Sequence, residues 1–371
     1  MNNPENLPGQ LVPVPSTMAR TIDGFVFDPG TDFWIVPTAA GSASFNFRNL
    51  PGASEKLCHG IKAACASMLL AIAPERAMKA LSGFRVLIRF LTAHAPGQPI
   101  DEISMADVYR YGASLPKRRQ YQLRRLKEYL LLWVGSGAPG LTMDLRQKLP
   151  KLLTETHEVG AAVRTMDPEE GPLTDIEYES VIAAIRHGFA TGTFSLSDYA
   201  LLVLAIALGA RPLQLAMMKV KDFSDTQRED GSSVFILQVT RLKQGKGIRP
   251  RTLFRPRELA SGVGELLRQQ CAIARLWAEE HGIAPEEAPI FPSHDATISQ
   301  EGLGELGLEG HISGKGLSEK LSRLFHKLSV QSARTGKNLN LFQTRLRRTF
   351  GTRAAAEGLS AAVIADLMDH S

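Results

Sequence analysis

Five basic side chains and no acidic one lie between Lys337 and Arg353. The five are Lys337, Arg345, Arg347, Arg348 and Arg353. In the same stretch Leu346, Phe350 and Ala354 recur at helical spacing, which predicts a helix anchored by one apolar face and cationic on the other. Guanidinium groups can hold two phosphate oxygens and stay charged at physiological pH, so this helix is suited to binding a phosphate group.

A second basic segment runs from Arg241 to Arg257. Between its ends it contains further cations, again without an acid: Lys243, Lys246, Arg249, Arg251 and Arg255. Two such segments in one chain indicate a phosphate-rich partner such as a nucleic acid. Charge alone leaves another interpretation open, in which both segments are solvated basic faces without a ligand.

Arg211 stands at a break between two predicted helices. The stretch 197–208 is almost wholly apolar after Asp198, which predicts a buried helix. Gly209 suits the C-terminal cap of this helix, and Pro212 suits the first turn of the next one. An arginine placed there leaves the core with its carbon stem fixed and its guanidinium directed at a partner, either a ligand or only a nearby carboxylate.

These elements, in this order, resemble the catalytic domain of the tyrosine recombinases, also called phage-type integrases, over residues 172–371. That family shows a G-x-R break, a K-T-G-K hairpin turn, an H-x-x-R helix, an L-G-H-S segment and then a tyrosine nucleophile. The matching segments here are Gly209-Ala210-Arg211, Lys243 in KQGK, Thr344-Arg345-Leu346-Arg347 and Leu367-Met368-Asp369-His370-Ser371. The resemblance implies a mainly α-helical (α+β) fold, in which a helical core-binding domain precedes a mostly helical catalytic domain with a small β-hairpin or sheet.

The resemblance also implies how the matched residues act. Cleaving a DNA phosphodiester without a metal requires cations on the non-bridging oxygens, an acid for the departing 5′ oxygen and a nucleophile in line. Arg211 and Arg347 would clamp the phosphate, and Lys243 would be the general acid. His370 would hydrogen-bond the same phosphate, and the Thr344 hydroxyl can donate one hydrogen bond. The alternatives are a solvated turn residue at Lys243 and a terminal residue without a role at His370.

The chain departs from the family pattern in four places. Gln214 stands where the family has an acid, Thr344 replaces the histidine of H-x-x-R, and Asp369 replaces the glycine of L-G-H-S. All six tyrosines precede Arg211, whereas the family nucleophile follows the second histidine by about two and a half helical turns. We expect the sequence to stop short of that tyrosine. A protein that never had one would bind a phosphate without forming a phosphotyrosyl bond.

Residues before the resemblance predict a helical domain. Apolar side chains at three- and four-residue spacing predict helices over 55–72, 77–94, 104–113 and 120–134. Cations gather around Tyr121 at the start of the last helix: Lys117, Arg118, Arg119, Arg124 and Arg125. A basic helix with an aromatic side chain can follow a DNA backbone and supply affinity rather than sequence choice, although a solvated helix face is the alternative. The predicted DNA contacts are these five residues with Lys246, Arg249, Arg345 and Arg348.

The stretch before the second domain becomes polar and rich in turn residues, which predicts an interdomain linker. Thr174 and Glu177 then form a predicted capping box that opens the next helix. The predicted organisation is an N-terminal arm or sheet-bearing extension (1–52), a core-binding domain (53–150), a linker (151–172) and a recombinase-like domain without its tyrosine segment (173–371). In the family the two domains close around the duplex as a clamp.

Composition agrees with a two-domain protein outside the membrane. The 371 residues, 44% of them hydrophobic, suffice for two cores, and the net charge of +5 is patterned rather than uniform. The three cysteines and the scattered histidines show no metal-ligand or disulfide spacing, so neither a metal nor a cofactor is expected. Without a signal peptide or an apolar run of membrane length, the expected location is the cytoplasm.

We therefore expect a site-specific DNA recombinase or integrase of a mobile element, which cleaves and rejoins strands through a 3′-phosphotyrosyl intermediate. Its expected partner is double-stranded DNA, on which it would assemble as a homo-tetramer or together with other recombinases. One alternative is a catalytically inactive DNA-binding accessory protein, favoured by Gln214, Thr344 and the absent tyrosine. The other is a basic helical scaffold that does not bind DNA.

Overall fold

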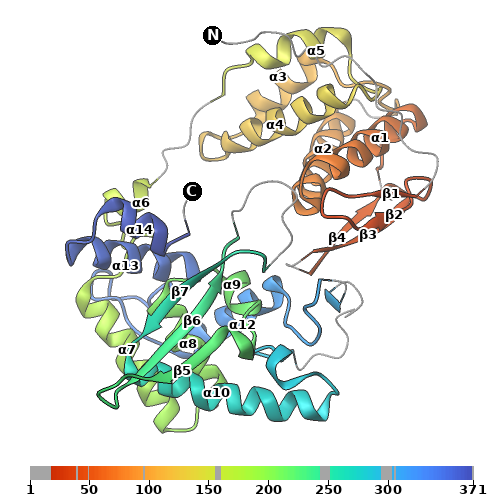
Figure 1. Ribbon diagram of the computed structural model, residues 1–371. Helices are drawn as coiled ribbons and strands as arrows, with labels where there is room; N and C mark the ends of the chain where they lie inside the picture. The colour runs from red at the N-terminus through yellow and green to blue at the C-terminus, as the bar shows by residue number, and fades with distance from the viewer. Residues whose placement is uncertain are drawn as a thin grey trace, which may run out of the picture. The chain divides into compact units, whose positions relative to one another are not determined.

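A computed structural model describes residues 18–38, 41–48, 50–94, 97–154, 160–242, 251–293, 303–304 and 306–369 (Figure 1). The chain divides into two compact units, Met1–Thr38 with Ser42–Glu158, and Ala39–Gly41 with Val159–Ser371. The predicted bounds of the arm, the core-binding domain, the linker and the recombinase-like domain stay predictions. Among the described residues, no helix is both long and apolar enough to span a membrane.

The first unit begins with two small antiparallel sheets. The strands are β1 (Ala19–Arg20), β2 (Val26–Phe27), β3 (Phe33–Thr38) and β4 (Gly41–Asn46). Burial alternates along β3 and β4, so each has one face against the core. Trp34 lies at the centre of this face, with its ring centroid 4.5 Å from that of Phe47. Arg85 donates a hydrogen bond to the Asn46 carbonyl oxygen and so ties β4 to the helices that follow.

A helical bundle makes up the rest of the first unit. Its elements are α1 (Glu55–Ala71), α2 (Pro74–His94), α3 (Met105–Ser114), η1 (Lys117–Arg119), α4 (Tyr121–Ser136), α5 (Met143–Lys148) and η2 (Leu149–Lys151). The four helices predicted from apolar spacing are confirmed, with bounds shifted by a few residues at most. Ser54 and Ser104 cap α1 and α3 through their side-chain oxygens, which satisfies backbone N–H groups that a helix start leaves free.

The second unit is mostly helical around a three-stranded antiparallel sheet. The sheet contains β5 (Phe223–Gln227), β6 (Ser233–Thr240) and β7 (Phe254–Leu259) in that order. The helices are α6 (Ala161–Arg164), α7 (Asp175–Ala190), α8 (Leu196–Leu208), α9 (Pro212–Ala216), η3 (Val220–Asp222), α10 (Ser261–Glu280), η4 (Pro285–Glu287), α12 (Gly314–Lys327), α13 (Gln343–Ala356) and α14 (Ala361–Leu367). The apolar α8 packs against α7, α10, α12 and α13, and it therefore forms the centre of this core.

The break between α8 and α9 has the local structure predicted for it. Gly209 ends α8 in the left-handed conformation with φ 52°, and Pro212 occupies the first turn of α9. A Cβ atom on Gly209 would lie 2.8 Å from the Cβ of Phe350 on α13. Glycine is therefore needed twice here, for its backbone conformation and for the close approach of α13.

Gly209→Ala should destabilise the second unit more than a substitution that only strains the backbone. We expect the free energy of unfolding in urea to fall by about 2–4 kcal/mol, because left-handed strain and overpacking add. The matched control is Gly192→Ala, since Gly192 has φ 75° with no atom within 4 Å of the added Cβ, and about 1 kcal/mol is expected there. Equal losses in the two variants would show that α13 does not press on Gly209.

Candidate phosphate-binding site

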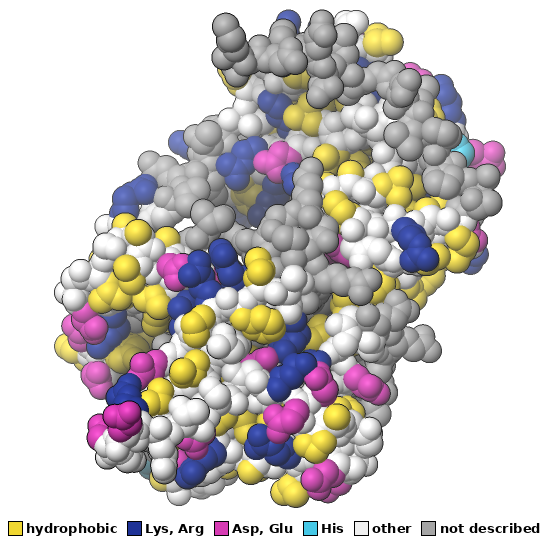
Figure 2. All heavy atoms as spheres, in the orientation of Figure 1, with side chains coloured by type: hydrophobic (Ala, Val, Ile, Leu, Met, Phe, Trp, Pro, Cys, Tyr) yellow, Lys and Arg dark blue, Asp and Glu magenta, His cyan; other side chains and the backbone are white. Residues whose placement is uncertain are grey.

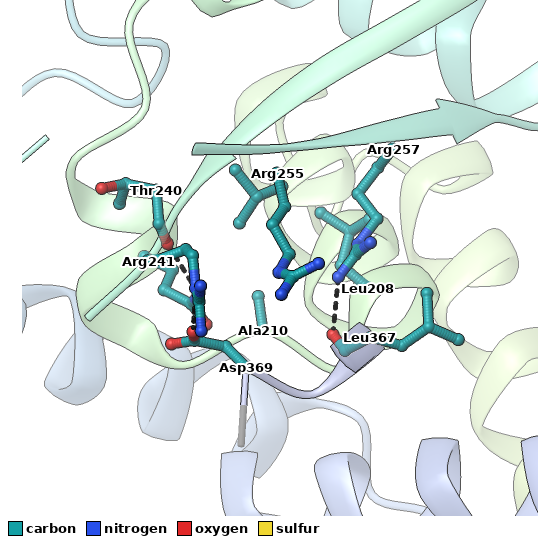
Figure 3. A pocket seen from close by; sticks show the side chains of 10 residues that line it. Leu208, Ala210, Thr240, Arg241, Arg255, Arg257, Leu367 and Asp369 are labelled. Atoms are coloured by element: carbon teal, nitrogen blue, oxygen red, sulfur yellow. Dashed lines mark hydrogen bonds and ion pairs between the residues drawn. The ribbon is translucent and has the colours of Figure 1, made fainter. Parts of the chain in front are cut away.

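Four segments of the second unit bring arginines to one place. Arg211 comes from the α8–α9 break, Arg241 from the end of β6, and Arg347 from α13. Arg255 and Arg257 extend from β7. Figure 3 shows Arg241, Arg255 and Arg257 lining a small pocket with Asp369, which follows α14. In Figure 2, Lys and Arg side chains gather on the face of the second unit near the place of β7 in Figure 1.

The guanidinium of Arg211 is held by residue 369. Its Nη1 donates to Asp369 Oδ2 at 3.0 Å, and its Nη2 donates to the Asp369 carbonyl oxygen at 3.3 Å. Gln214, which stands where the family motif has an acid, forms hydrogen bonds to the backbone of two elements. Its Oε1 accepts from the Arg211 backbone N–H, and its Nε2 donates to the Thr240 carbonyl oxygen at 2.8 Å. Gln214 thus joins the start of α9 to the end of β6 without supplying a charge.

Arg347 is buried beside this break, with 9% of its surface exposed. Its Nη1 donates to the Gly209 carbonyl oxygen at 2.8 Å. Its Nη2 is also buried and has no hydrogen-bond partner among the described residues. Burial and, next, the charge of Arg211 lower the pKa of the Arg347 guanidinium to about 10, while Asp369 acts in the opposite direction. The group stays charged at neutral pH, and its unpartnered nitrogen suits an anion.

Gln343 fixes the start of α13 against the same break. Its Nε2 donates to the Ala210 carbonyl oxygen at 2.7 Å and to the Ala205 carbonyl oxygen at 3.3 Å. Arg211 and Arg347 therefore occupy defined places relative to each other. Thr344, the next residue of α13, is exposed at the first turn of the helix. Its hydroxyl carries no charge, so the described cationic groups at this site are the arginines.

Three arginines of the cluster had no site role predicted from the sequence. Arg241 Nε donates to Asp369 Oδ1 at 3.1 Å, and Arg255 forms an ion pair with Asp366 on α14. Arg257 Nη2 donates to the Leu367 carbonyl oxygen at 2.9 Å. Residues two apart on a strand share a face, so the spacing of 255 and 257 is a signal that both point the same way. The contribution of Arg241 depends on the register of β6 and carries no such signal.

Asp369 is the carboxylate at the centre of the cluster, with 3% of its surface exposed. Besides the two arginines, the Leu242 backbone N–H donates to its Oδ2 at 3.0 Å. Burial raises the pKa of the Asp369 carboxyl. Hydrogen bonds from Leu242 and Arg241 and the charge of Arg211 outweigh this effect, and the pKa lies below its ordinary value. The carboxylate is ionised at neutral pH and neutralises part of the arginine charge.

Several predicted site residues lie outside the described part of the chain. They are Lys243, Lys246, Arg249 and His370. The described residues next to them, Leu242 and Asp369, are joined by a hydrogen bond. Leu242 and Asp369 thus meet at the arginine cluster. Among the described residues, no group of three or more His, Cys, Asp or Glu side chains is arranged to hold a metal.

The prediction that Arg345 contacts DNA is wrong, because its side chain is completely buried. Nε donates to the Gly171 carbonyl oxygen at 2.9 Å, Nη1 to that of Asn340 at 2.8 Å, and Nη2 to that of Pro168 at 2.7 Å. Glu177, also fully buried, lies 3.8 Å from Nη2. Arg345 thus holds chain segments together, and its charge is satisfied inside the protein.

The predicted cationic face of α13 is correspondingly reduced. Arg345 and Arg347 are both buried, whereas Arg348 and Arg353 are partly exposed. Arg348 donates to the Glu170 carbonyl oxygen. Arg353 pairs with Asp175 and lies 4.1 Å from the centroid of the Tyr178 ring. Contact of Arg348 with DNA stays a prediction.

The predicted basic cluster of the first unit is on the surface. Lys117, Arg118 and Arg119 form the exposed η1 turn before α4. Arg125 is also exposed and lies 5.3 Å from the centroid of the Tyr121 ring. Arg124 is partly buried. Within the described residues none of these five side chains forms an ion pair, so their charge is available to an external anion.

No family model matches the chain, and no curated protein matches its sequence. Its fold, however, resembles solved structures. One is a lambda integrase dimer bound to a COC′ core site. The match covers 87% of this chain and 77% of the integrase chain, with 13% identity and a TM-score of 0.52. Another is the Tn1549 transposon integrase in complex with circular intermediate DNA. The match covers 84% of this chain and 92% of the integrase chain, with 16% identity and a TM-score of 0.51. The fold resembles that of these integrases, which confirms the predicted mainly α class with small sheets.

Replacing Arg345 should destabilise the second unit without weakening a DNA contact. For Arg345→Ala we expect a loss of about 3 kcal/mol in the free energy of unfolding, because three carbonyl oxygens and Glu177 lose a buried cation. Arg348→Ala is the control on the same helix, and its loss should stay within about 1 kcal/mol. Urea denaturation followed by circular dichroism measures both. An unchanged midpoint for Arg345→Ala, together with weaker DNA binding, would show that Arg345 contacts DNA after all.

Proposed function

We propose that the protein is a site-specific DNA recombinase or integrase of the tyrosine type. The observation that carries the proposal is that Arg347 lies close to Arg211 and has a buried Nη2 without a hydrogen-bond partner among the described residues. Cations gathered from distant parts of the chain repel one another, so their convergence makes sense where an anion is bound. The similar structures are integrases bound to DNA, which favours a DNA phosphate as that anion.

In this proposal the two arginines bind the non-bridging oxygens of the phosphate to be cleaved. A tyrosine hydroxyl attacks phosphorus, and its proton passes to solvent water as the new P–O bond forms. The P–O bond to the 5′ oxygen breaks, and Lys243 donates a proton to that oxygen. The products are a 3′-phosphotyrosyl link and a free 5′ hydroxyl, so the reverse reaction rejoins strands without another energy source. Charge that grows on phosphorus oxygens in the transition state is stabilised by groups already in place.

The proposal also requires a tyrosine nucleophile at the arginine cluster. Both tyrosines of the second unit pack away from the arginine cluster. Tyr199 stacks on Phe189 with ring centroids 4.4 Å apart, and Tyr178 lies under Arg353. Both line a pocket between α7, α8 and α10. Neither therefore competes for the role of nucleophile.

The exposed basic turn of the first unit would bind DNA backbone in the same complex. Its arginines and lysine would release counterions from phosphates and so contribute affinity that falls with salt. Assembly as a homo-tetramer or with other recombinases, action on a mobile element and a cytoplasmic location belong to the same proposal.

A DNA-binding accessory protein without catalytic activity is the second candidate. It is favoured by Thr344, which is exposed and uncharged where the family has a histidine, and by the carboxylate of Asp369, which neutralises part of the cluster. The two candidates differ in whether DNA strands are cut. They agree in predicting salt-dependent DNA binding.

Arg347→Ala should abolish strand cleavage while leaving much of the DNA affinity. The complete product of the gene is incubated with a supercoiled plasmid, because a transient covalent nick lets supercoils relax. We expect relaxation to slow by at least about 10³-fold, as when a transition-state arginine is removed. Arg353→Ala, on the same helix but paired with Asp175, should keep wild-type activity. Relaxation by Arg347→Ala at the wild-type rate would remove Arg347 from the site, and an inactive wild type with intact DNA binding would favour the accessory protein.

Removing charge from the basic turn should weaken DNA binding in a salt-dependent way. For the Arg118→Ala/Arg119→Ala variant, we expect a shallower slope of log K against log salt in fluorescence anisotropy with duplex DNA. The slope should change by about 0.9 for each phosphate that the variant no longer neutralises. Lys56→Ala is the control, since Lys56 is an exposed cation of the same unit that pairs with Glu102 at 2.8 Å. Equal slopes in the wild type and the double variant would place DNA elsewhere. A flat wild-type response would support the scaffold that does not bind DNA.

A further inference from the structure

The side chain of Asp369 joins its own segment, after α14, to two segments that carry candidate functional residues. Its Oδ2 accepts from Arg211 at the α8–α9 break and from the Leu242 amide next to Lys243. Its Oδ1 accepts from Arg241 at the end of β6. One carboxylate therefore sets the distance between the first arginine of the site and the start of the segment that holds Lys243.

The contacts of Arg211 with residue 369 leave donors for a ligand. A guanidinium has five N–H groups. One on Nη1 and one on Nη2 are directed at residue 369, so three are not used by the described residues. The carboxylate can accordingly orient this arginine and still leave its fork able to donate to phosphate oxygens.

The electrostatics of the cluster require a carboxylate. Arg211 is close enough to Arg347 to lower its pKa, so the two cations repel each other, and Asp369 opposes that effect. Gln214 supplies hydrogen bonds here but no negative charge. Residue 369 also has φ 50°, a backbone conformation that costs an aspartate free energy. A glycine would avoid this cost but would lack the carboxylate.

We propose that Asp369 is a positioning residue for phosphate binding, which holds Arg211, Arg241 and the entry to the Lys243 segment in register. It supplies the negative charge that Gln214 does not supply. This inference rests on the proposed function and extends it, because it assigns the orientation of the phosphate-binding arginines to a carboxylate from another element. A purely structural role and a carboxylate that occupies the place of the phosphate are the competing explanations.

The test compares Asp369→Asn and Asp369→Gly with Asp366→Asn. Both aspartates pair with an arginine of the cluster, and each substitution removes one negative charge, so the variants have the same net charge. Asparagine tolerates the left-handed backbone and glycine adopts it freely, so at least one variant should fold. Thermal unfolding is followed at increasing concentrations of inorganic phosphate, which should raise Tm by binding to the folded protein. The part of this rise that is lost in Arg347→Ala is the part that comes from the cluster.

We expect both Asp369 variants to lose that part of the rise in Tm, while Asp366→Asn keeps it. Affinity for duplex DNA should fall about tenfold in the Asp369 variants relative to Asp366→Asn, although the net charge is the same. Because the phosphate titration uses no DNA, it remains decisive even if the wild type fails to bind DNA, an outcome that would refute the proposed function alone.

Four results would overturn the inference. A lower Tm of the free variants with an unchanged phosphate-induced rise would make Asp369 purely structural, as would loss of folding in both variants. A larger rise than in Asp366→Asn would mean that the carboxylate occupies the place of the phosphate. An intact rise in Arg347→Ala would show that phosphate does not bind at this cluster.

Discussion

Repulsion between buried or half-buried arginines is the constraint on which the second unit depends. Arg211, Arg241 and Arg347 come from separate elements, and nothing in their own charges favours their meeting. The ionised carboxylate of Asp369 lies between them and offsets part of that repulsion. Backbone carbonyl oxygens complete the balance, since Gly209 accepts from Arg347 and residue 369 from Arg211. The cluster keeps a net positive charge in a defined shape, which is what binding a phosphate requires.

A second buried charge network holds the first turn of α13 in place. Glu177 at the start of α7 accepts from Ser332 and from Arg334, whose Nη2 lies 2.7 Å from Oε2. Arg345 adds its guanidinium and three bonds to carbonyl oxygens. Buried charges that lose a partner are costly, so this network resists any shift of the first turn of α13. Arg347 follows in the same turn, and its position is thereby fixed from both sides.

Local signals allowed much of this fold to be predicted. The capping box of Thr174 and Glu177, the left-handed cap at Gly209 and the helix start at Pro212 each depend on neighbours within a few residues, and the structure contains all three. The meeting of Arg211 with Arg347 was expected only through the family resemblance. Burial of Arg345 could not be predicted from spacing, because its acceptors belong to residues far away in the sequence.

Asp369 illustrates the same limit for the site. In the sequence it is a departure from a glycine motif, and its spacing gives no indication that it will face two arginines and a strand end. Only the folded chain shows that the loss of an acid at Gln214 and the gain of one at Asp369 occur in the same cluster. Two departures that separately weaken the motif thus become compatible with one phosphate site.

The most direct test of this phosphate site is the anomalous diffraction of crystals soaked in tungstate, an anion of phosphate-like shape with a heavy scatterer. The account predicts a peak within hydrogen-bond distance of Arg347 Nη2 and of the Arg211 guanidinium, and no such peak in Arg347→Ala crystals. Tungstate bound only elsewhere, with none at the cluster, would contradict the central claim that these arginines form an anion site.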